Sequence, residues 1–236
     1  MAMHHAHYLR RARELCERYR VHLIADEIAV GFGRTGSFFA CQQAGIWPDL
    51  LCLSKGITGG FMPLSVVLCR SAIYRAFLSD DVARGFLHSH SYSGNALACR
   101  AALAVLDRFE QRDVLGDNAR MAAVLDTALA PLAQDPRLQH LRRCGMIWAF
   151  DVRAEHAPER FAERLHTVGR AHELLLRPIG RTVYLMPPYL LDQALARWLA
   201  ERLIGTLNDT LNPAAADYPG AAWPSDADRT PEPPTA

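Results

Sequence analysis

Lysine is almost absent from this 236-residue chain: of its 26 basic residues, 25 are arginine and one, Lys55, is lysine. The 25 acidic residues nearly balance them, and the net charge of +1 leaves no basic surplus to neutralise nucleic acid or an anionic membrane. The chain also lacks a run of about eighteen apolar residues and an apolar secretory signal. We therefore expect a protein that binds neither nucleic acid nor membrane.

Cysteine pairs at metal-binding or redox spacing are missing as well. The six cysteines are scattered without a C-x-x-C pair and lie mostly within apolar runs. Such cysteines are typical of a reducing compartment, so we predict a cytoplasmic protein without disulfides or a zinc site. The early histidines His4, His5 and His7 have no acidic or cysteine partner at ligand spacing. We interpret them as the start of a helix.

The hydrophobic pattern predicts alternating helices and short strands. Helices are expected near 5–20, 38–45, 71–78 (capped by Ser71), 95–110, 118–133, 158–172 and 191–208, and strands at 21–25, 50–53, 64–68, 138–144, 146–153 and 182–186. Apolar strands separated by helices and glycine-rich turns are typical of an α/β sheet covered on both faces. The later elements favour a smaller α+β domain.

The composition changes at residue 213. Six of the fourteen prolines fall in residues 213–236, among alanine, aspartate and threonine. A segment of this composition cannot bury a core, and we predict that it is disordered.

The glycines Gly31, Gly33 and Gly36 match G-x-G-x-x-G, a pattern found in dinucleotide-binding proteins. That motif leads directly from a strand into a helix whose N-terminus binds the pyrophosphate. Here five residues, two of them acidic, separate the strand from the first glycine. Dinucleotide binding therefore stays a minor alternative.

Asp26 and Lys55 each follow an apolar strand, and neighbouring strands would bring them to one edge of the sheet. A buried carboxylate needs a cationic partner, which is either an arginine such as Arg34 or a protonated ring nitrogen of a ligand. A lysine amine, unlike a guanidinium, can lose its proton and attack a carbonyl. A Schiff-base lysine and an aspartate beneath a pyridinium nitrogen are what pyridoxal phosphate requires.

The longer pattern around both residues resembles the class III pyridoxal-phosphate aminotransferases. It consists of Asp26-Glu27-Ile28, Gly31–Gly36, Pro48-Asp49, and Ser54-Lys55-Gly56 with Gly59-Gly60. The resemblance covers residues 1 to about 210 and implies the α/β architecture of fold type I. Residues 1–110 would form the C-terminal part of the large, mostly parallel-sheet cofactor domain, residues 111–212 the small α+β domain, and residues 213–236 the tail.

The resemblance also implies roles for residues at the cofactor. Lys55 would hold pyridoxal phosphate covalently and later move the substrate proton. Asp26 would keep the pyridine nitrogen protonated, and Ile28 would pack on one face of the ring. The family's earlier half, which supplies the glycine-rich turn for the phosphate and a stacking aromatic, has no counterpart here. We therefore expect an N-terminally truncated chain with weak or no activity.

Further roles follow from the same resemblance. Ser91 would bind the cofactor phosphate across the interface of a homodimer, with His90 beside it for the cofactor and Ser89 for the substrate. Arg177 would bind the substrate carboxylate, which suits its fork of donors. Tyr184 would line the same pocket.

Two segments suggest the substrates. Residues Gly85–Asn95, and Arg177–Gly180 with Tyr184–Tyr189, are most similar to the family members of biotin biosynthesis. Those members transfer an amino group from S-adenosylmethionine to 8-amino-7-oxononanoate, giving 7,8-diaminononanoate. Another class III aminotransferase acting on ω-amino acids, or a catalytically inactive fragment, remains open.

Overall fold

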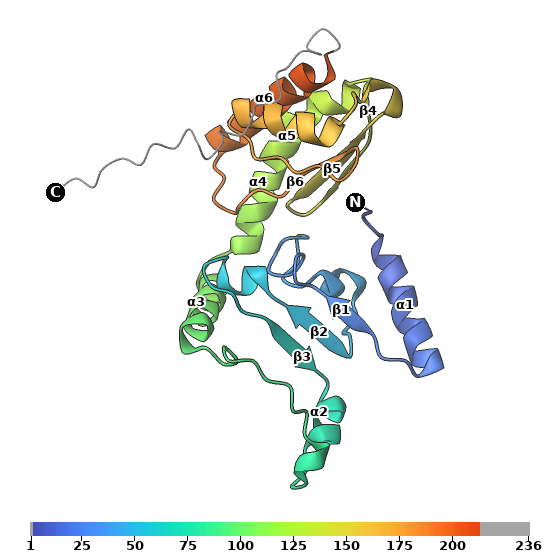
Figure 1. The fold of residues 1–236 in the computed structure, drawn as a ribbon, viewed down its shortest axis with the longest axis vertical. Coiled ribbons are helices and arrows are strands. Elements are labelled where there is room, and N and C mark those ends of the chain that lie inside the picture. Colours follow the sequence, from blue (N-terminus) through green and yellow to red (C-terminus); the bar gives the residue numbers. More distant parts are fainter. Residues whose placement is uncertain (1, 213–236) are drawn as a thin grey trace, which may run out of the picture.

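The computed structural model describes residues 2–212, which form two α/β units joined by the consecutive helices α3 and α4 (Figure 1). The first unit contains α1 (Ala6–Tyr19), β1 (Ile24–Asp26), η1 (Ala40–Ala44), β2 (Leu50–Leu53), η2 (Lys55–Thr58), β3 (Val66–Cys69), α2 (Ser71–Phe77), η3 (Val82–Arg84) and α3 (Ala96–Gln111). The second contains α4 (Val114–Leu129), η4 (Ala130–Gln134), β4 (Leu138–Cys144), β5 (Ile147–Val152), η5 (Ala154–His156), α5 (Phe161–Ala171), β6 (Thr182–Leu185) and α6 (Gln193–Leu211). The tail predicted to be disordered lies outside the described residues.

The predicted helices and strands are present, and the first strand is shorter than expected. Arg20 adopts a left-handed conformation as the C-cap of α1, and the backbone N–H of Val21 donates to Cys16 O at 2.8 Å. This closure of the helix end uses residues that the apolar pattern assigns to the strand. The strand therefore begins at Ile24.

Two helix starts also differ from the prediction. Ser71 is the first residue of α2 and not its cap, because the carbonyl of Arg70 already accepts the N–H of Ile73 at 2.9 Å. The helix expected from residue 118 begins at Val114, where the carboxylate of Asp113 accepts the N–H of Gly116 and caps it.

The first unit is built on a mixed three-stranded sheet in the order β1-β2-β3. β1 is parallel to β2, and β2 is antiparallel to β3. One face carries Ala25 and packs on a small core of Phe32, Leu51, Leu53, Ile57 and Ala102. On the other face Ile24 and Val67 are 59% and 57% exposed. The prediction of a sheet covered on both faces is therefore wrong for the described residues, because their helices pack against one face only.

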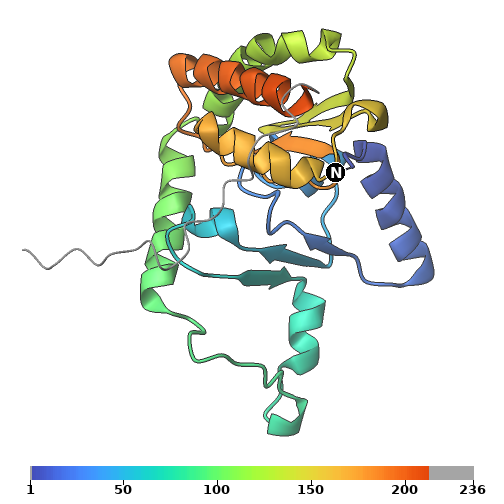
Figure 2. The same cartoon turned by 45° about the horizontal axis from the view of Figure 1, so that its top comes forward.

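The second unit holds the larger core. Its antiparallel sheet, in the order β4-β5-β6, is covered on one face by α4, α5 and α6 (Figure 2). Trp148, Phe150 and Val152 of β5, the central strand, are all buried, and so is Leu203 of α6. Among residues 2–212, twenty buried residues form this core, against five in the core of the first unit, so the second unit supplies most of the hydrophobic stabilisation.

The histidine cluster lies where the sequence analysis expects it. His5 is the N-cap of α1, and its Nδ1 accepts the N–H of His7 at 3.2 Å, so the histidine cluster does mark a helix start. The six cysteines are all free thiols. Within residues 2–212, no helix has both the length and the apolar character that crossing a membrane requires.

Candidate active site

Asp26 and Lys55 lie at the same edge of the first sheet. Asp26 ends β1 and pairs in register with Cys52 of the parallel strand β2. Lys55 follows β2 after a single residue, Ser54. Because the carboxyl ends of neighbouring parallel strands meet at one edge, both residues lie there, as the sequence predicts. This is the edge at which open α/β sheets bind their ligands.

Tight local structure fixes the backbone of Lys55. Its φ of 46° lies in the left-handed region, which is uncommon for a residue with a side chain. The hydroxyl of Ser54 donates to Leu64 O at 2.7 Å, and that of Thr58 donates to Met62 O at 2.6 Å, so both ends of the turn are held. A Cβ on Gly56 would lie 3.0 Å from the Cβ of Phe32, which leaves little room for any other residue there. Strained backbone held by its surroundings is common at functional sites.

Asp26 and Lys55 are both exposed, and within the described residues neither forms an ion pair. The carboxylate of Asp26 accepts the N–H of Ile28 at 3.0 Å. The alternative in which Arg34 neutralises Asp26 is therefore wrong, because the guanidinium of Arg34 lies elsewhere.

Arg34 connects the glycine loop to the second unit. Its NH1 donates to Pro187 O at 2.7 Å, and its guanidinium lies 4.6 Å from the centre of the Tyr189 ring. The Tyr189 hydroxyl donates to Phe32 O at 2.9 Å, and the N–H of Met146 donates to Arg34 O at 2.9 Å. Burial lowers the pKa of Arg34 and raises that of Tyr189. The loop that follows Asp26 is thus fixed against the second unit.

Glu27, which the sequence analysis left without a role, anchors the other end of this loop. Its side chain is buried and accepts the N–H groups of Ala40 at 2.6 Å and Cys41 at 2.8 Å, at the start of η1. Burial and the adjacent Glu27 carboxylate raise the pKa of the Cys41 thiol to about 12, so Cys41 stays a neutral thiol. An acidic residue directly after a strand and before a glycine loop is the signal that could have indicated this anchor.

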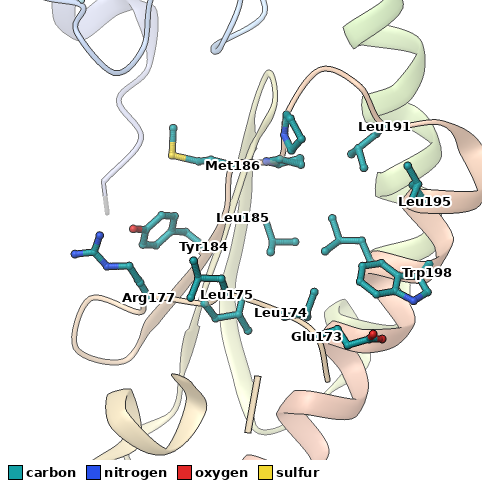
Figure 3. A pocket seen from close by; sticks show the side chains of 14 residues that line it. Glu173, Leu174, Leu175, Arg177, Tyr184, Leu185, Met186, Leu191, Leu195 and Trp198 are labelled. Carbon is teal, nitrogen blue, oxygen red and sulfur yellow. The ribbon is translucent and has the colours of Figure 1, made fainter. Parts of the chain in front are cut away.

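Arg177 and Tyr184 lie together at one end of a pocket in the second unit (Figure 3). The pocket has a volume of about 380 Å³, and most of its wall is leucine, proline and Trp198. Pro187, which Arg34 contacts, also lines it. Within the described residues Arg177 has no ion pair or hydrogen bond, so its guanidinium is available to a ligand.

Ser89, His90 and Ser91 are not brought to Lys55. All three are exposed in the segment that joins α2 to α3, where the N–H of His90 donates to the Ser93 hydroxyl at 3.0 Å. β3 runs antiparallel to β2, so the chain leaves the sheet at the edge opposite Lys55. Figure 1 shows α2 projecting from the body of the molecule on that side.

Comparison with known proteins identifies the family. The family model described as "Aminotransferase class-III" matches residues 1–207 of the chain. The chain belongs to the class III aminotransferase family. An adenosylmethionine-8-amino-7-oxononanoate aminotransferase of Helicobacter pylori is 42% identical over 214 residues, which are 89% of this chain and 49% of that protein. One from Nitratidesulfovibrio vulgaris is 40% identical over 85% of this chain and 38% of its own length.

Solved aminotransferase structures share the fold. An amine transaminase from an uncultivated Pseudomonas species, solved with pyridoxal phosphate bound, superposes with a TM-score of 0.77 at 34% identity, over 87% of this chain and 48% of that one. An adenosylmethionine-8-amino-7-oxononanoate aminotransferase from Methanocaldococcus jannaschii gives a TM-score of 0.78 at 29% identity, over 86% of this chain and 49% of the other. The architecture is that of fold type I, and the chain spans about half the length of these class III relatives.

Proposed function

We propose that the chain carries the cofactor edge of a pyridoxal-phosphate-dependent aminotransferase. The observation that supports this is the position of Lys55 and Asp26 at the carboxyl edge of two paired parallel strands. Lys55 is the only lysine in the sequence, so no other side chain offers an amine that can bind a carbonyl.

The residues at the edge fit the cofactor. Lys55 and Asp26 are exposed and free of ion pairs within residues 2–212, so an amine and a carboxylate at the same edge of the sheet are available to a ligand. Ile28, half-buried and two residues beyond Asp26, offers an apolar surface to one face of a ring. When bound, pyridoxal phosphate supplies an aldehyde that carries the amino group and a protonated ring that withdraws electrons.

The chain's own side chains have three tasks in this reaction. The carboxylate of Asp26 would hold the proton on the pyridine nitrogen. The Lys55 amine would hold the cofactor and would take the proton from the substrate carbon that bears the amino group. Arg177 binds the substrate carboxylate through its guanidinium, with Tyr184 beside it.

We further propose S-adenosylmethionine as the amino donor and 8-amino-7-oxononanoate as the acceptor, which places the protein in biotin biosynthesis. The relatives at 40–42% identity carry this activity in their names. An acceptor with an aliphatic chain and a terminal carboxylate suits an apolar pocket that has Arg177 at one end. As in the sequence analysis, we expect residues 1–110 and 111–212 to be its two domains and the cytoplasm to be its location.

A homodimer accounts for the remaining predicted residues. In this proposal Ser91 and His90 bind the cofactor phosphate of a second copy, and Ser89 contacts its substrate. Support comes from the exposed apolar side chains of the same segment, Phe86 at 70% and Leu87 at 78%. A face of this kind is typical of an interface. Sedimentation of the chain should give twice the monomer mass, and Leu87→Ser should shift it towards monomer.

Borohydride reduction with pyridoxal phosphate tests the cofactor assignment. Peptide mass mapping should place the added mass on the peptide that contains Lys55, and Lys55→Arg should abolish it because a guanidinium does not react in this way. Asp26→Asn is the matched control: it should retain the label, since it leaves the amine in place. A label found only on the α-amine of Met1, or one that survives in Lys55→Arg, would contradict the proposal.

Turnover separates the remaining alternatives. The chain is incubated with pyridoxal phosphate, 8-amino-7-oxononanoate and either S-adenosylmethionine or an ω-amino acid as donor. Product formed only with the ω-amino acid would contradict the proposed donor. Labelling at Lys55 without any turnover would identify the chain as an inactive fragment.

A further inference from the structure

The segment that carries Arg177 lies outside both sheets. Between α5 and β6 the chain is extended, with Leu174 and Leu176 buried at 6% and 5% exposure and Leu175 at 77%. This alternation directs Arg177 outward with Leu175. Because no strand in the part of the chain that the structure describes bonds to residues 174–177, something else must hold their backbone in place.

Helix α5 holds the segment at two points. The N–H of Leu174 donates to Gly169 O at 2.7 Å, and Nδ1 of His166 lies 2.9 Å from Leu176 O. A carbonyl oxygen only accepts, so the proton of this bond is on Nδ1 of His166. A Cβ on Gly169 would lie 3.1 Å from Leu174 O, which shows how closely the segment packs on the helix.

The carbonyl that His166 binds belongs to the residue directly before Arg177. The guanidinium has no hydrogen bond or ion pair within residues 2–212, so its position depends on its backbone. We propose that His166 is a positioning residue: by holding Leu176 O, it presents Arg177 at the end of the pocket for the carboxylate of a ligand. The identity of that ligand rests on the proposed function, whereas the positioning does not.

A loss of this hydrogen bond has a specific consequence. The backbone before Arg177 would gain freedom, and a carboxylate ligand would then have to order it on binding. The affinity for an aliphatic carboxylate should fall. The affinity for an uncharged ligand of the same chain length should stay the same. His166→Leu removes the donor at similar volume, and His166→Asn returns an amide N–H at the position of Nδ1.

Nonanoate and nonanamide serve as probes, with binding to the chain followed by NMR at the Trp198 indole and the Arg177 backbone amide. We expect His166→Leu to lower the affinity for nonanoate at least about fivefold and to change the affinity for nonanamide by less than twofold. His166→Asn should recover most of the lost nonanoate affinity. The matched control is His172→Leu. The Nε2 of His172 lies 2.7 Å from the carboxylate of Asp209 in α6, so this side chain bonds to α6 and not to the segment that carries Arg177. Arg177→Met should remove the preference for nonanoate.

Three results would overturn the proposal. They are unchanged nonanoate affinity in His166→Leu, an equal loss for nonanamide, and nonanoate binding to the unaltered chain that is absent or independent of Arg177. Amide hydrogen exchange adds a readout without ligand, and faster exchange at residues 174–177 is expected in His166→Leu only. None of these measurements involves Lys55 or the cofactor, so a failure of the labelling experiment would refute the proposed function and not this inference.

Discussion

Gly145, in the turn between β4 and β5, shows how one residue joins the two units. Its φ is +57°, and an added Cβ would lie 2.2 Å from the carbonyl carbon of Thr35 and 2.4 Å from the nitrogen of Gly36. These are backbone atoms of the glycine loop, which cannot move aside as a flexible side chain could. Glycine is therefore required here by its conformation and by the close approach of another segment.

We predict that Gly145→Ala destabilises the protein by about 2 kcal/mol or more, because the strain of a positive φ adds to a backbone clash. The free energy of unfolding in urea, followed by tryptophan fluorescence, measures the effect. Gly45→Ala is the control: Gly45 also has a positive φ, +65°, and an added Cβ meets nothing within 4 Å. It should cost only about 1 kcal/mol. Equal effects would show that the approach of Gly145 to the loop contributes nothing.

The second sheet is cross-linked by a carboxylate on its central strand. Asp151 of β5 accepts the hydroxyl of Thr182 from β6 at 2.7 Å, and NH1 of Arg142 from β4 at 3.1 Å. Nδ1 of His140, which lies at the register shift of β4, is 3.1 Å away. Partial burial opposes ionisation, but these three hydrogen bonds outweigh it and lower the pKa of Asp151 to about 2.

This depressed pKa makes the second unit sensitive to acid. A carboxyl group titrates near about 3.9 when unfolded, so ionised Asp151 contributes about 2 kcal/mol to stability above roughly pH 5. The contribution is lost as the pH falls through the folded pKa, with about half gone by pH 3. Urea unfolding at pH 7 and pH 3 should therefore show a smaller loss in Asp151→Asn than in the unaltered chain.

The control for this prediction is Asp107→Asn. Asp107 on α3 forms an exposed pair with Arg100 at 3.5 Å, and pairs of this kind contribute little. It should leave the acid dependence unchanged. If the unaltered chain and Asp151→Asn lose the same stability between pH 7 and pH 3, the hydrogen bonds to Asp151 do not stabilise the sheet.

At the scale of the whole molecule, burial is uneven. Of the 24 exposed large hydrophobic side chains in residues 2–212, nineteen lie in residues 2–106, whereas the twenty-residue core belongs to the second unit. Stability within a protein follows local burial, so the two units should open with different free energies. The open sheet face and the projecting α2 segment place most of the unpartnered apolar surface in the first unit (Figure 1).

Native-state hydrogen exchange should reveal this difference. We expect the amides of β5 to exchange at least about tenfold more slowly than those of β1 and β3. The strand β5 lies between β4 and β6, and its side chains pack in the core with the helices. Helix α6, whose buried face includes Leu203 and Leu207, should be protected with β5. Uniform protection across both sheets would mean that the two units unfold together.

The sequence predicted most of the helices and strands, and it predicted that Asp26 and Lys55 lie at one edge of the sheet. Periodicity located the elements because helices and strands are stabilised by local spacing of apolar residues. The placement of Asp26 and Lys55 at one edge of the sheet followed from two successive apolar strands, and the motifs around them resembled those of the family. The exposed apolar surface of the first unit could not be predicted from the sequence. An apolar strand shows that its side chains can be buried, but it does not show whether residues 2–212 contain the elements that bury them.

The tertiary structure decided which distant residues meet. Arg34 donates to a carbonyl 153 residues away, and Glu27 anchors a helix start. His166 holds the segment before Arg177, although nothing in the motif marks it. Sequence patterns fix what depends on near neighbours, such as strand periods, helix periods and motif chemistry. Contacts between the units depend on how complete elements pack, since a backbone carbonyl is the same acceptor at every position until the fold brings a donor to it.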